Sequence, residues 1–448
     1  MLTRLTLSVG SPLAIGVVVS VLAMQSPAFG STALRSSHPV GTRTSGLRTS
    51  PGALDTTFSG DGKVMTQFAS TSADQAAAVA IQADGKIVAA GMSHDGYDGF
   101  ALARYNIDGT LDSSFGDSGE VVTYFNAGSE DEAFAVAIQT DGKIVAAGAT
   151  GSSDRRFAVA RYNADGSPDS TFGGDGKVTT HFGTRSVDLA FAVAVQADGK
   201  IVAAGVSNDR FALARYKPDG TRDGTFSGDG RLTTRFRAAS SDEAHAAIIQ
   251  GDGSILVAGQ SYPSSTATSN FALARYDSRG RLDPSFGGDG KVTTDFSGAE
   301  DAGVGVAMQA DGKIVAAGFS RNTFALARYT TRGRLDTTFG GDGKVTTHFA
   351  TGSTDGAQAV AVQADGKIIA VGDSFLTHVR FAIARYTARG RLDATFGGDG
   401  RVITQFATGS DDIAFGVAIQ ADGKIVAAGN SQPSVYESEF ALARYLAA

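Results

Sequence analysis

No cysteine occurs among the 448 residues, which excludes disulfide bonds, thiolate metal sites and cysteine nucleophiles together. Proline is also scarce, at 9 residues, whereas glycine is abundant, at 58. An apolar fraction of 42% with this glycine content is typical of a folded, β-rich protein, because strands need apolar faces and tight turns need glycine. Packing, rather than covalent cross-links, must therefore stabilise the fold.

Positive charge is not in excess, since 46 acidic residues outnumber 39 basic ones. The net charge of -7 lacks the strongly basic character of nucleic-acid-binding proteins, so we expect no nucleic-acid partner. The chain also lacks G-x-S-x-G, H-E-x-x-H and phosphate-binding loop motifs, and its six histidines do not have metal-ligand spacing. We therefore predict no catalytic residue, no metal and no cofactor.

Long hydrophobic runs are absent except near the N-terminus, where an apolar stretch spans residues 13–24. Arg4 precedes it and Ala28-Phe29-Gly30 follows it, as in a signal peptide cleaved before Ser31. These 12 residues fall short of the ~20 that a spanning helix needs, so we expect no transmembrane segment in the mature chain. The expected organisation is a signal peptide at 1–30, a flexible lead-in at 31–53 and a folded region at 54–446, secreted or associated with the cell envelope.

What the chain has in abundance is repetition. A segment reading A-V-A-I-Q-T-D-G-K-I-V-A-A-G at 135–148 has close copies throughout the folded region. The turn glycines of the seven copies are Gly85, Gly142, Gly199, Gly253, Gly312, Gly366 and Gly423. Each copy contains four strand-like segments, of the types K-V-T-T-x-F, A-V-A-V-Q, K-I-V-A-A-G and F-A-L-A-R-Y. The Asp-Gly pair between the second and third segments predicts a hairpin with a type I′ turn.

Seven four-stranded units form either an open stack or a closed ring. Open stacks need polar capping repeats, and neither terminal copy is atypical, so we predict an all-β, seven-bladed β-propeller. If the A-V-A-V strand is innermost, the last blade lacks its outer strand. We expect the N-terminal K-V-M-T-Q-F segment at 63–68 to supply that strand and close the ring.

Three recurring motifs, L-D-x-x-F-G-G-D-G-K-V, Q-A-D-G-K-I-V-A-A-G and F-A-L-A-R-Y, resemble those of the bacterial delta-60 repeat family. The resemblance covers about the whole of 54–445. It implies an exported protein with propeller-like repeats and no generally assigned activity. Local departures are Ser254, where the other copies have lysine, and Asp-Ser-Gly at 117–119.

Every F-A-L-A-R-Y strand carries an arginine and every linker carries an aspartate in the D-x-x-F motif. A buried arginine needs a carboxylate partner, so we predict one Arg–Asp staple in each blade, with anion binding as the alternative. Across the ring closure, Arg444 should meet Asp55 as Arg104 meets Asp112.

A second set of aspartates lies 11 residues before each turn glycine, at the entrance of the inner strand. Its members are Asp74, Asp131, Asp188, Asp242, Asp301, Asp355 and Asp412. Such a ring is a candidate binding site for a cation or a basic partner at the mouth of the channel. Capping of the local loop or hydrogen bonding to the backbone is the favoured explanation, because blades about 10 Å apart cannot share one calcium ion.

The units differ most in the loops between the K-I-V and F-A-L segments, so a unique binding function should lie there. Non-repeated aromatic residues in these loops are Tyr97, Tyr262, Phe375 and Tyr436. They suit contact with a protein or a carbohydrate, whereas ordinary loop variation is the other explanation.

These observations predict an exported, monomeric propeller that acts as a structural or binding scaffold for an unknown extracellular protein or carbohydrate. The alternative function is an extracellular hydrolase or lyase with a carboxylate site at the central channel, which fold alone cannot exclude. A third reading is a calcium-stabilised adhesin, although the repeated Asp-Gly pairs lack the spacing of a calcium loop.

Overall fold

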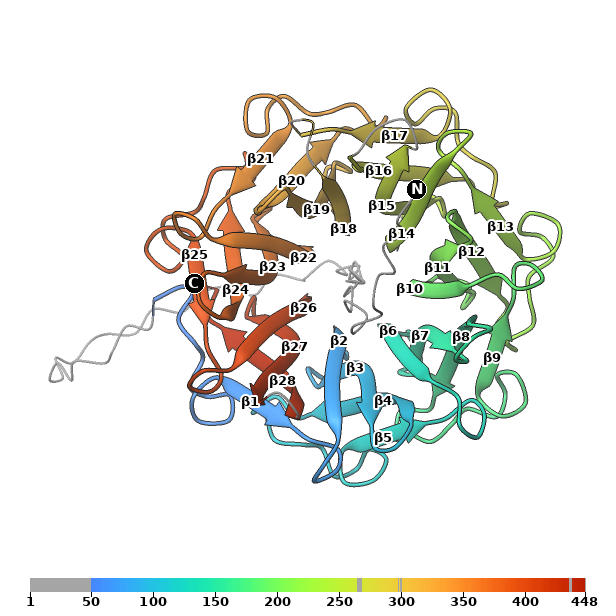
Figure 1. Cartoon of the computed structure of the whole chain (residues 1–448), viewed down its shortest axis with the longest axis horizontal. Coiled ribbons are helices and arrows are strands. Elements are labelled where there is room, and N and C mark those ends of the chain that lie inside the picture. The colour runs from blue at the N-terminus through green and yellow to red at the C-terminus, as the bar shows by residue number, and fades with distance from the viewer. Residues whose placement is uncertain (1–49, 264–267, 297, 299, 435–436, 448) are drawn as a thin grey trace, which may run out of the picture.

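The computed structural model describes residues 50–263, 268–296, 298, 300–434 and 437–447 of the chain. These residues form a ring of seven antiparallel sheets, and no helix occurs among them (Figure 1). Accordingly, the described part of the chain holds no helix of the length and hydrophobicity that a bilayer crossing requires. The predicted signal peptide at 1–30 and the lead-in up to residue 49 lie outside the described residues.

Each blade has four strands, which run from the channel outward in chain order. Blade 1 comprises β2 (Ala73–Ile81), β3 (Ile87–His94), β4 (Asp98–Tyr105) and β5 (Glu120–Thr123). Blade 2 comprises β6 (Asp131–Ile138), β7 (Ile144–Thr150), β8 (Arg156–Tyr162) and β9 (Lys177–Thr180). Blade 3 comprises β10 (Asp188–Val195), β11 (Ile201–Ser207), β12 (Phe211–Tyr216) and β13 (Arg231–Thr234).

The second half of the ring repeats this order. Blade 4 comprises β14 (Ser240–Ile249), β15 (Ile255–Pro263), β16 (Asn270–Tyr276) and β17 (Lys291–Thr294). Blade 5 comprises β18 (Asp301–Met308), β19 (Ile314–Ser320), β20 (Thr323–Tyr329) and β21 (Lys344–Thr347). Blade 6 comprises β22 (Thr354–Val362), β23 (Ile368–Phe375), β24 (Val379–Tyr386) and β25 (Arg401–Thr404). Blade 7 comprises β26 (Asp411–Ile419), β27 (Ile425–Ser434), β28 (Glu437–Tyr445) and, from the start of the described chain, β1 (Lys63–Thr66).

The ring closes as the sequence predicts. Strand β1 pairs antiparallel with β28, with Lys63 opposite Ala443 and Thr66 opposite Phe440. Figure 1 shows this contact as the blue β1 beside the red β28. Because the first described strand covers the edge of the last one, the third strand of blade 7, β28, is not left with an unpaired edge.

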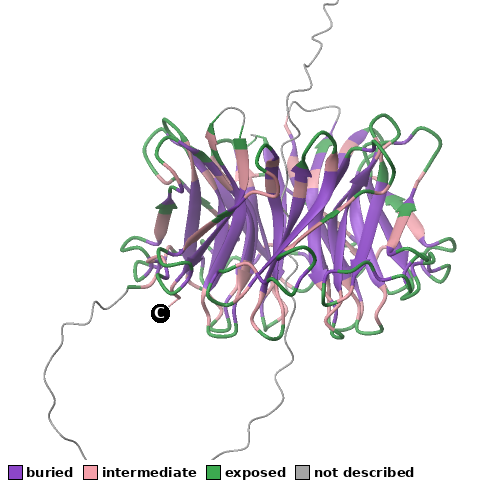
Figure 2. Ribbon diagram, turned by 90° about the horizontal axis from the view of Figure 1, so that it is seen from below, coloured by how far each residue is buried: buried purple, intermediate pink, exposed green. Residues whose placement is uncertain are grey.

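The core lies between and within the blades, and the strands are buried while the loops at both ends of the ring are exposed (Figure 2). Phenylalanines at repeated positions pack in pairs, such as Phe157 against Phe182, with ring centroids 4.9 Å apart and the rings tilted by 65°. At the closure, Phe68 packs against Phe440 at the same distance and angle. This edge-to-face packing is a preferred arrangement of aromatic pairs.

The inner hairpins lie where predicted, but the predicted type I′ turn is wrong. In blade 1, Gly85 N donates to Gln82 O at 2.9 Å, and Gln82 N donates to Lys86 O at 2.8 Å. Gly85 has a φ of 87°, whereas Asp84 is not among the residues with positive φ. A type I′ turn needs positive φ at both central residues, so this connection is a longer turn that ends in a left-handed glycine.

We call the end of the ring that holds residues 92–99 and their equivalents in the other blades the loop face. The opposite end holds the hairpin turns, such as 82–86, and the linkers between third and outer strands, such as 106–119; we call it the linker face.

Candidate functional site

Each blade contains the predicted arginine staple at the linker face. In blade 1, Arg104 Nε lies 2.7 Å from Asp112 Oδ2, and Lys86 Nζ lies 2.7 Å from the same oxygen. The guanidinium also lies over the Phe115 ring, 4.6 Å from its centroid. Burial alone would raise the pKa of Asp112, but hydrogen bonds from Lys86 and Ser114 outweigh it and hold that pKa well below its ordinary value.

The staple across the closure is also formed, because Arg444 Nε lies 2.8 Å from Asp55 Oδ2. In all seven blades the Nε–Oδ2 distance is between 2.7 and 3.0 Å. The remaining guanidinium nitrogens are used as well: Arg161 Nη1 donates to Pro218 O in the next blade, and Nη2 donates to Thr171 Oγ1. The structural interpretation therefore accounts for these arginines, and anion binding is not needed to explain them.

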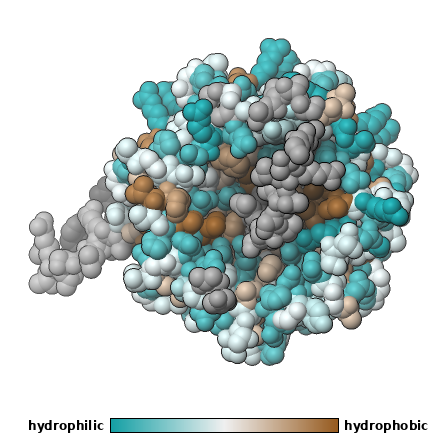
Figure 3. Space-filling view, viewed as in Figure 1, coloured by the Kyte–Doolittle hydropathy of each residue, from teal (hydrophilic) through white to brown (hydrophobic). Residues whose placement is uncertain are grey.

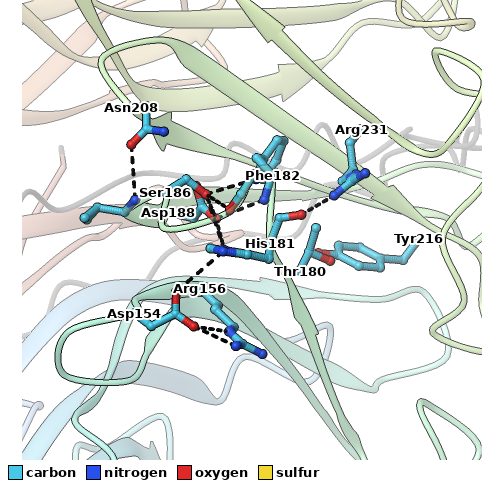
Figure 4. Close-up of polar contacts among 12 residues, drawn as sticks. Asp154, Arg156, Thr180, His181, Phe182, Ser186, Asp188, Asn208, Tyr216 and Arg231 are labelled. Atoms are coloured by element: carbon cyan, nitrogen blue, oxygen red, sulfur yellow. Dashed lines mark hydrogen bonds and ion pairs between the residues drawn. The ribbon is translucent and has the colours of Figure 1, made fainter.

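The seven aspartates at the inner-strand entrances are 0% to 1% exposed and cap the preceding turn. In blade 3, Asp188 Oδ2 accepts hydrogen bonds from Phe182 N at 3.0 Å and from Ser186 Oγ at 2.8 Å (Figure 4). His181 Nδ1 lies 2.8 Å from the same oxygen. Sequence reasoning missed this histidine contact, although His348 occupies the equivalent position and lies 3.1 Å from Asp355.

Burial raises the pKa of Asp74, although Ser72 and Ser93 donate hydrogen bonds that oppose this effect. Ser93 stands opposite Asp74 on the neighbouring strand. Each of these carboxylates thus lies within its own blade, and the described residues include no cluster of three or more histidine, aspartate or glutamate side chains that could hold a metal ion. This geometry favours turn capping over a shared cation site.

The predicted loop aromatics lie at the surface. Tyr97 is 60% exposed, Tyr262 39% and Phe375 46%, and Leu376 beside Phe375 is 56% exposed. They belong to blades 1, 4 and 6, so they mark three separate points of the loop face rather than one pocket. Tyr436 lies outside the described residues.

A feature that sequence reasoning missed is a ring of β-bulges around the channel. The register of every inner hairpin shifts at the same point, between Ala133 and Ala135 in blade 2, so that one residue has no partner. The bulged residues are Ala77, Phe134, Phe191, His245, Val304, Gln358 and Phe415. Three of them are phenylalanine and the other four are four different residues, whereas alanine or glycine flanks each of them, and this variability was the available signal.

The bulged side chains meet across blades. The Phe134 and Phe191 rings lie 5.2 Å apart, and Phe191 lies 5.4 Å from the His245 ring. Burial lowers the pKa of His245 to about 4, so its imidazole is neutral near pH 7. The side chains at the seven bulged positions are buried and mainly apolar.

Three carboxylates near this ring have raised pKa values, and each has its own partner. Burial raises the pKa of Glu132, although Arg155 lies 3.0 Å away. Burial also raises the pKa of Glu243, which accepts a hydrogen bond from Gln260 at 3.0 Å. In blade 6, burial raises the pKa of Asp373 to about 6, and Gln358 Nε2 donates to it at 3.4 Å. Since these groups lie on blades 2, 4 and 6, they do not form the paired acid and base of a hydrolase.

Comparison with solved structures finds several proteins that match most of this chain at low sequence identity. A streptogramin B lyase is 11% identical, with 85% of this chain and 97% of that chain covered and a TM-score of 0.48. The virginiamycin B lyase from Staphylococcus aureus is 10% identical, with 85% and 98% covered and a TM-score of 0.48. A gluconolactonase from Xanthomonas campestris is 14% identical, with 85% and 99% covered and a TM-score of 0.36. Among curated proteins, none matches the sequence.

The family assignment rests on the repeats themselves. One family, described as "Domain of unknown function (DUF5122) beta-propeller", matches seven segments of the chain, one for each repeat. The matched residues are 82–115, 139–172, 196–226, 250–286, 309–339, 363–396 and 420–447. Together they make up about half of the chain and include the hairpin turn and the arginine strand of every blade. The chain therefore belongs to the DUF5122 β-propeller family.

Proposed function

We propose that this propeller is an exported scaffold that binds a protein or a carbohydrate through its loop face. The observation that carries the proposal is the exposure of Tyr97, Tyr262, Phe375 and Leu376 on that face, whereas most aromatic residues of the blades are buried. Exposed aromatic side chains combine apolar area with low conformational entropy, which suits contact surfaces. The N-terminal signal-like segment supports export, and the three recurring motifs support the delta-60 name for the repeats.

The rest of each blade offers little else for a ligand. The buried arginines and aspartates are engaged in staples and caps that recur in every blade, and a recurring contact explains stability rather than specific binding. Hydrophobic surface in the space-filling view lies in patches towards the middle of the face shown, inside a mainly hydrophilic rim (Figure 3).

A hydrolase or lyase at the channel is not favoured. The bulged ring is mainly apolar, and the carboxylates beside it, Glu132, Glu243 and Asp373, lie on separate blades, each with its own partner. A strongly coupled carboxylate pair in the channel would have favoured the enzyme.

The test compares two sets of apolar-to-polar changes. The loop variant carries Tyr97→Ser, Tyr262→Ser and Phe375→Ser. The rim control carries Met65→Thr, Val122→Thr and Ile403→Thr, which introduces the residue that the other four outer strands have at this exposed position. Both proteins are used in pull-downs from cell-surface extracts and on a glycan array.

We expect the loop variant to lose about tenfold or more in binding, while the rim control retains it. Equal binding by both variants, with unchanged melting temperatures, would contradict the assignment of the loop face. A secreted fraction that lacks the protein would contradict export.

A further inference from the structure

The tips of the turns that follow the third strands form two sectors of the linker face, one basic and one acidic. In blades 4, 5 and 6 the turn that follows the third strand reads Arg-Gly-Arg, and in blades 1, 2 and 3 the equivalent turn reads Asp-Gly-Thr or Asp-Gly-Ser. The six arginines are Arg279, Arg281, Arg332, Arg334, Arg389 and Arg391, and all are exposed. The equivalent aspartates, Asp108, Asp165 and Asp219, are exposed as well. We call the six-arginine surface the arginine arc.

The three Arg-Gly-Arg turns follow one another around the ring. Each turn contacts the linker of the preceding blade: Gly287 N donates to Arg332 O at 3.0 Å, and Gly340 N donates to Arg389 O at 3.1 Å. The turn of blade 6 therefore lies against the linker of blade 5, and that of blade 5 against the linker of blade 4. This chain of contacts makes the arginine arc a continuous strip over three adjacent blades.

The arginines are not needed to form these turns. In blade 1 the turn is held by Asp108 Oδ1, which accepts hydrogen bonds from Thr110 N and Thr110 Oγ1. In blade 5 the hydroxyl of Thr330 accepts from Arg334 N instead, so a backbone group of the arginine residue is used and its side chain is not. The turn forms with either sequence, so folding does not explain why blades 4, 5 and 6 have arginine at these positions.

Most of these guanidinium groups have no partner within the described chain. Arg281 pairs with Asp277, at 2.8 Å from Nη2 to Oδ2. Among the described residues, the other five make no ion pair and no side-chain hydrogen bond. Five unpaired cations on one strip attract counter-charge, and guanidinium groups match carboxylate and sulfate oxygens in a bidentate manner.

We propose that the arginine arc binds an anionic polysaccharide, meaning a linear glycan that carries carboxylate or sulfate groups. A polymer fits because the charges repeat along a strip of three blades rather than converging in one pocket. Single-stranded nucleic acid fits less well, since its bases require aromatic stacking platforms and none of the Arg-Gly-Arg turns contains an aromatic residue. This site lies on the face opposite the loop aromatics and does not depend on them.

The experiment uses a matched pair of charge variants in the full chain. The arc variant carries Arg332→Asn and Arg389→Asn. The control variant carries Arg185→Asn and Arg321→Asn, two exposed arginines in loops at the loop face whose φ values of 63° and 54° asparagine tolerates. Both variants lose two positive charges. A difference in their affinity for the polymers therefore reflects where the arginines lie and not the net charge of the protein.

Binding is measured by calorimetric titration with polygalacturonate and with dextran sulfate, with neutral dextran as the uncharged probe. We expect the arc variant to bind both charged polymers about tenfold more weakly than the unchanged chain, the control variant to bind within about twofold of it, and added salt to weaken all binding. Preference for one charged polymer identifies carboxylate or sulfate as the natural group.

Three results would overturn the proposal. The first is equal loss in the arc and control variants, which would mean that only overall charge matters. The second is tighter binding of single-stranded DNA than of either polysaccharide. The third is salt-sensitive self-association that the arc variant abolishes while no polymer binds, which would show that the acidic sector of a second copy is the partner. A thermal melt of each variant confirms that the propeller remains folded.

Discussion

Blade 7 is assembled from two distant parts of the chain, whereas blades 1 to 6 are each continuous, and yet the two kinds of blade make the same contacts. Arg444 and Asp55 are 389 residues apart and lie 2.8 Å from each other; Arg104 and Asp112 are 8 residues apart and lie 2.7 Å from each other. The outer strand pairs through four residues in both cases. The repeat therefore specifies contacts by position in the blade and not by distance along the chain.

The junction between blades 7 and 1 differs from the other junctions: a parallel bridge joins Ala73 of β2 to Ser438 of β28, and the outer strand of blade 1 lacks a basic side chain. At other junctions a basic side chain of the outer strand reaches the end of the preceding outer strand, as Lys63 Nζ does toward Gln405 O at 3.2 Å and Lys177 Nζ does toward Tyr124 O at 3.0 Å. Blade 1 has Glu120 at this position. Burial, together with the charges of Asp74 and Asp117, raises the pKa of Glu120 to about 7. The ring closure thus has the same arginine staple as the other blades, but the outer edge of the junction between blades 7 and 1 lacks the basic side chain found at the other junctions.

The largest expected effect comes from removing the closing strand. Deletion of residues 54–68 exposes the edge of β28 and removes Asp55, so we expect aggregation and loss of a cooperative melting transition. Size-exclusion chromatography and calorimetry measure both. The control is a chain that begins at Ser50, which should melt cooperatively. A deleted protein that stays monomeric with an unchanged melting temperature would refute closure by β1.

Breaking one staple tests whether the closure and an internal blade are equally important. We expect Asp55→Ala and Asp169→Ala each to lower the free energy of unfolding by about 3 to 5 kcal/mol, because each leaves a buried guanidinium without its carboxylate. Urea denaturation measures both values. A much smaller loss for Asp55→Ala than for Asp169→Ala would show that blade 7 opens before the rest of the ring.

Glu120→Lys gives the closure the cation that other junctions have. We expect stabilisation by about 1 kcal/mol, since the new ammonium can donate to carbonyl groups at the end of β1. Thermal melts at neutral pH measure it. Glu120→Gln serves as the control that removes the charge without adding a donor, and equal melting of both variants would contradict a role for the cation.

The same residue predicts a pH dependence. The pKa of Glu120 is about 7 in the folded protein and 4.5 in the reference state, so the folded protein holds this proton more tightly. Its contribution to stability is therefore present below about pH 4.5 and is lost as the pH rises through 7. Glu120→Gln should remove this part of the pH dependence between those values. An unchanged stability profile in the variant would contradict the assignment.

The smallest expected effect is at blade 4, where Ser254 replaces the hairpin lysine. Elsewhere that lysine contacts the staple carboxylate, as Lys143 does with Asp169 at 2.7 Å. Ser254→Lys should stabilise the protein by less than about 1 kcal/mol, because the side chain of Asp283 is 25% exposed and solvent screens the pair. Lys143→Ser in blade 2 is the reverse change and should destabilise by a larger amount, because the side chain of Asp169 is only 3% exposed and solvent screens that pair less.

Much of this architecture could be predicted because the same sequence motifs occur seven times along the chain, once in each blade. The strand order, the closure by residues 63–66 and the Arg444–Asp55 contact all followed from the phase of the repeat. The hairpin turn was predicted wrongly because Asp-Gly is compatible with more than one turn, and the additional residues Gln82 and Ala83 decide which one forms. The entrance aspartates were identified as a candidate ring and as caps of their local turns, and the structure shows the capping contacts and their burial.

By itself, the sequence determined the number of blades, the pairing of strands and the staples. The alternating apolar residues of each repeat must be buried, and each buried arginine needs a carboxylate partner, so few arrangements of the repeats are possible. Only the tertiary structure decided which variable residues meet. Phe134, Phe191 and His245 are 57 and 54 residues apart along the chain and touch because the inner strands converge on one axis. The three Arg-Gly-Arg turns likewise become one strip because each turn packs on the preceding blade. Contacts within a blade are encoded locally, whereas contacts between blades depend on the curvature of the closed ring.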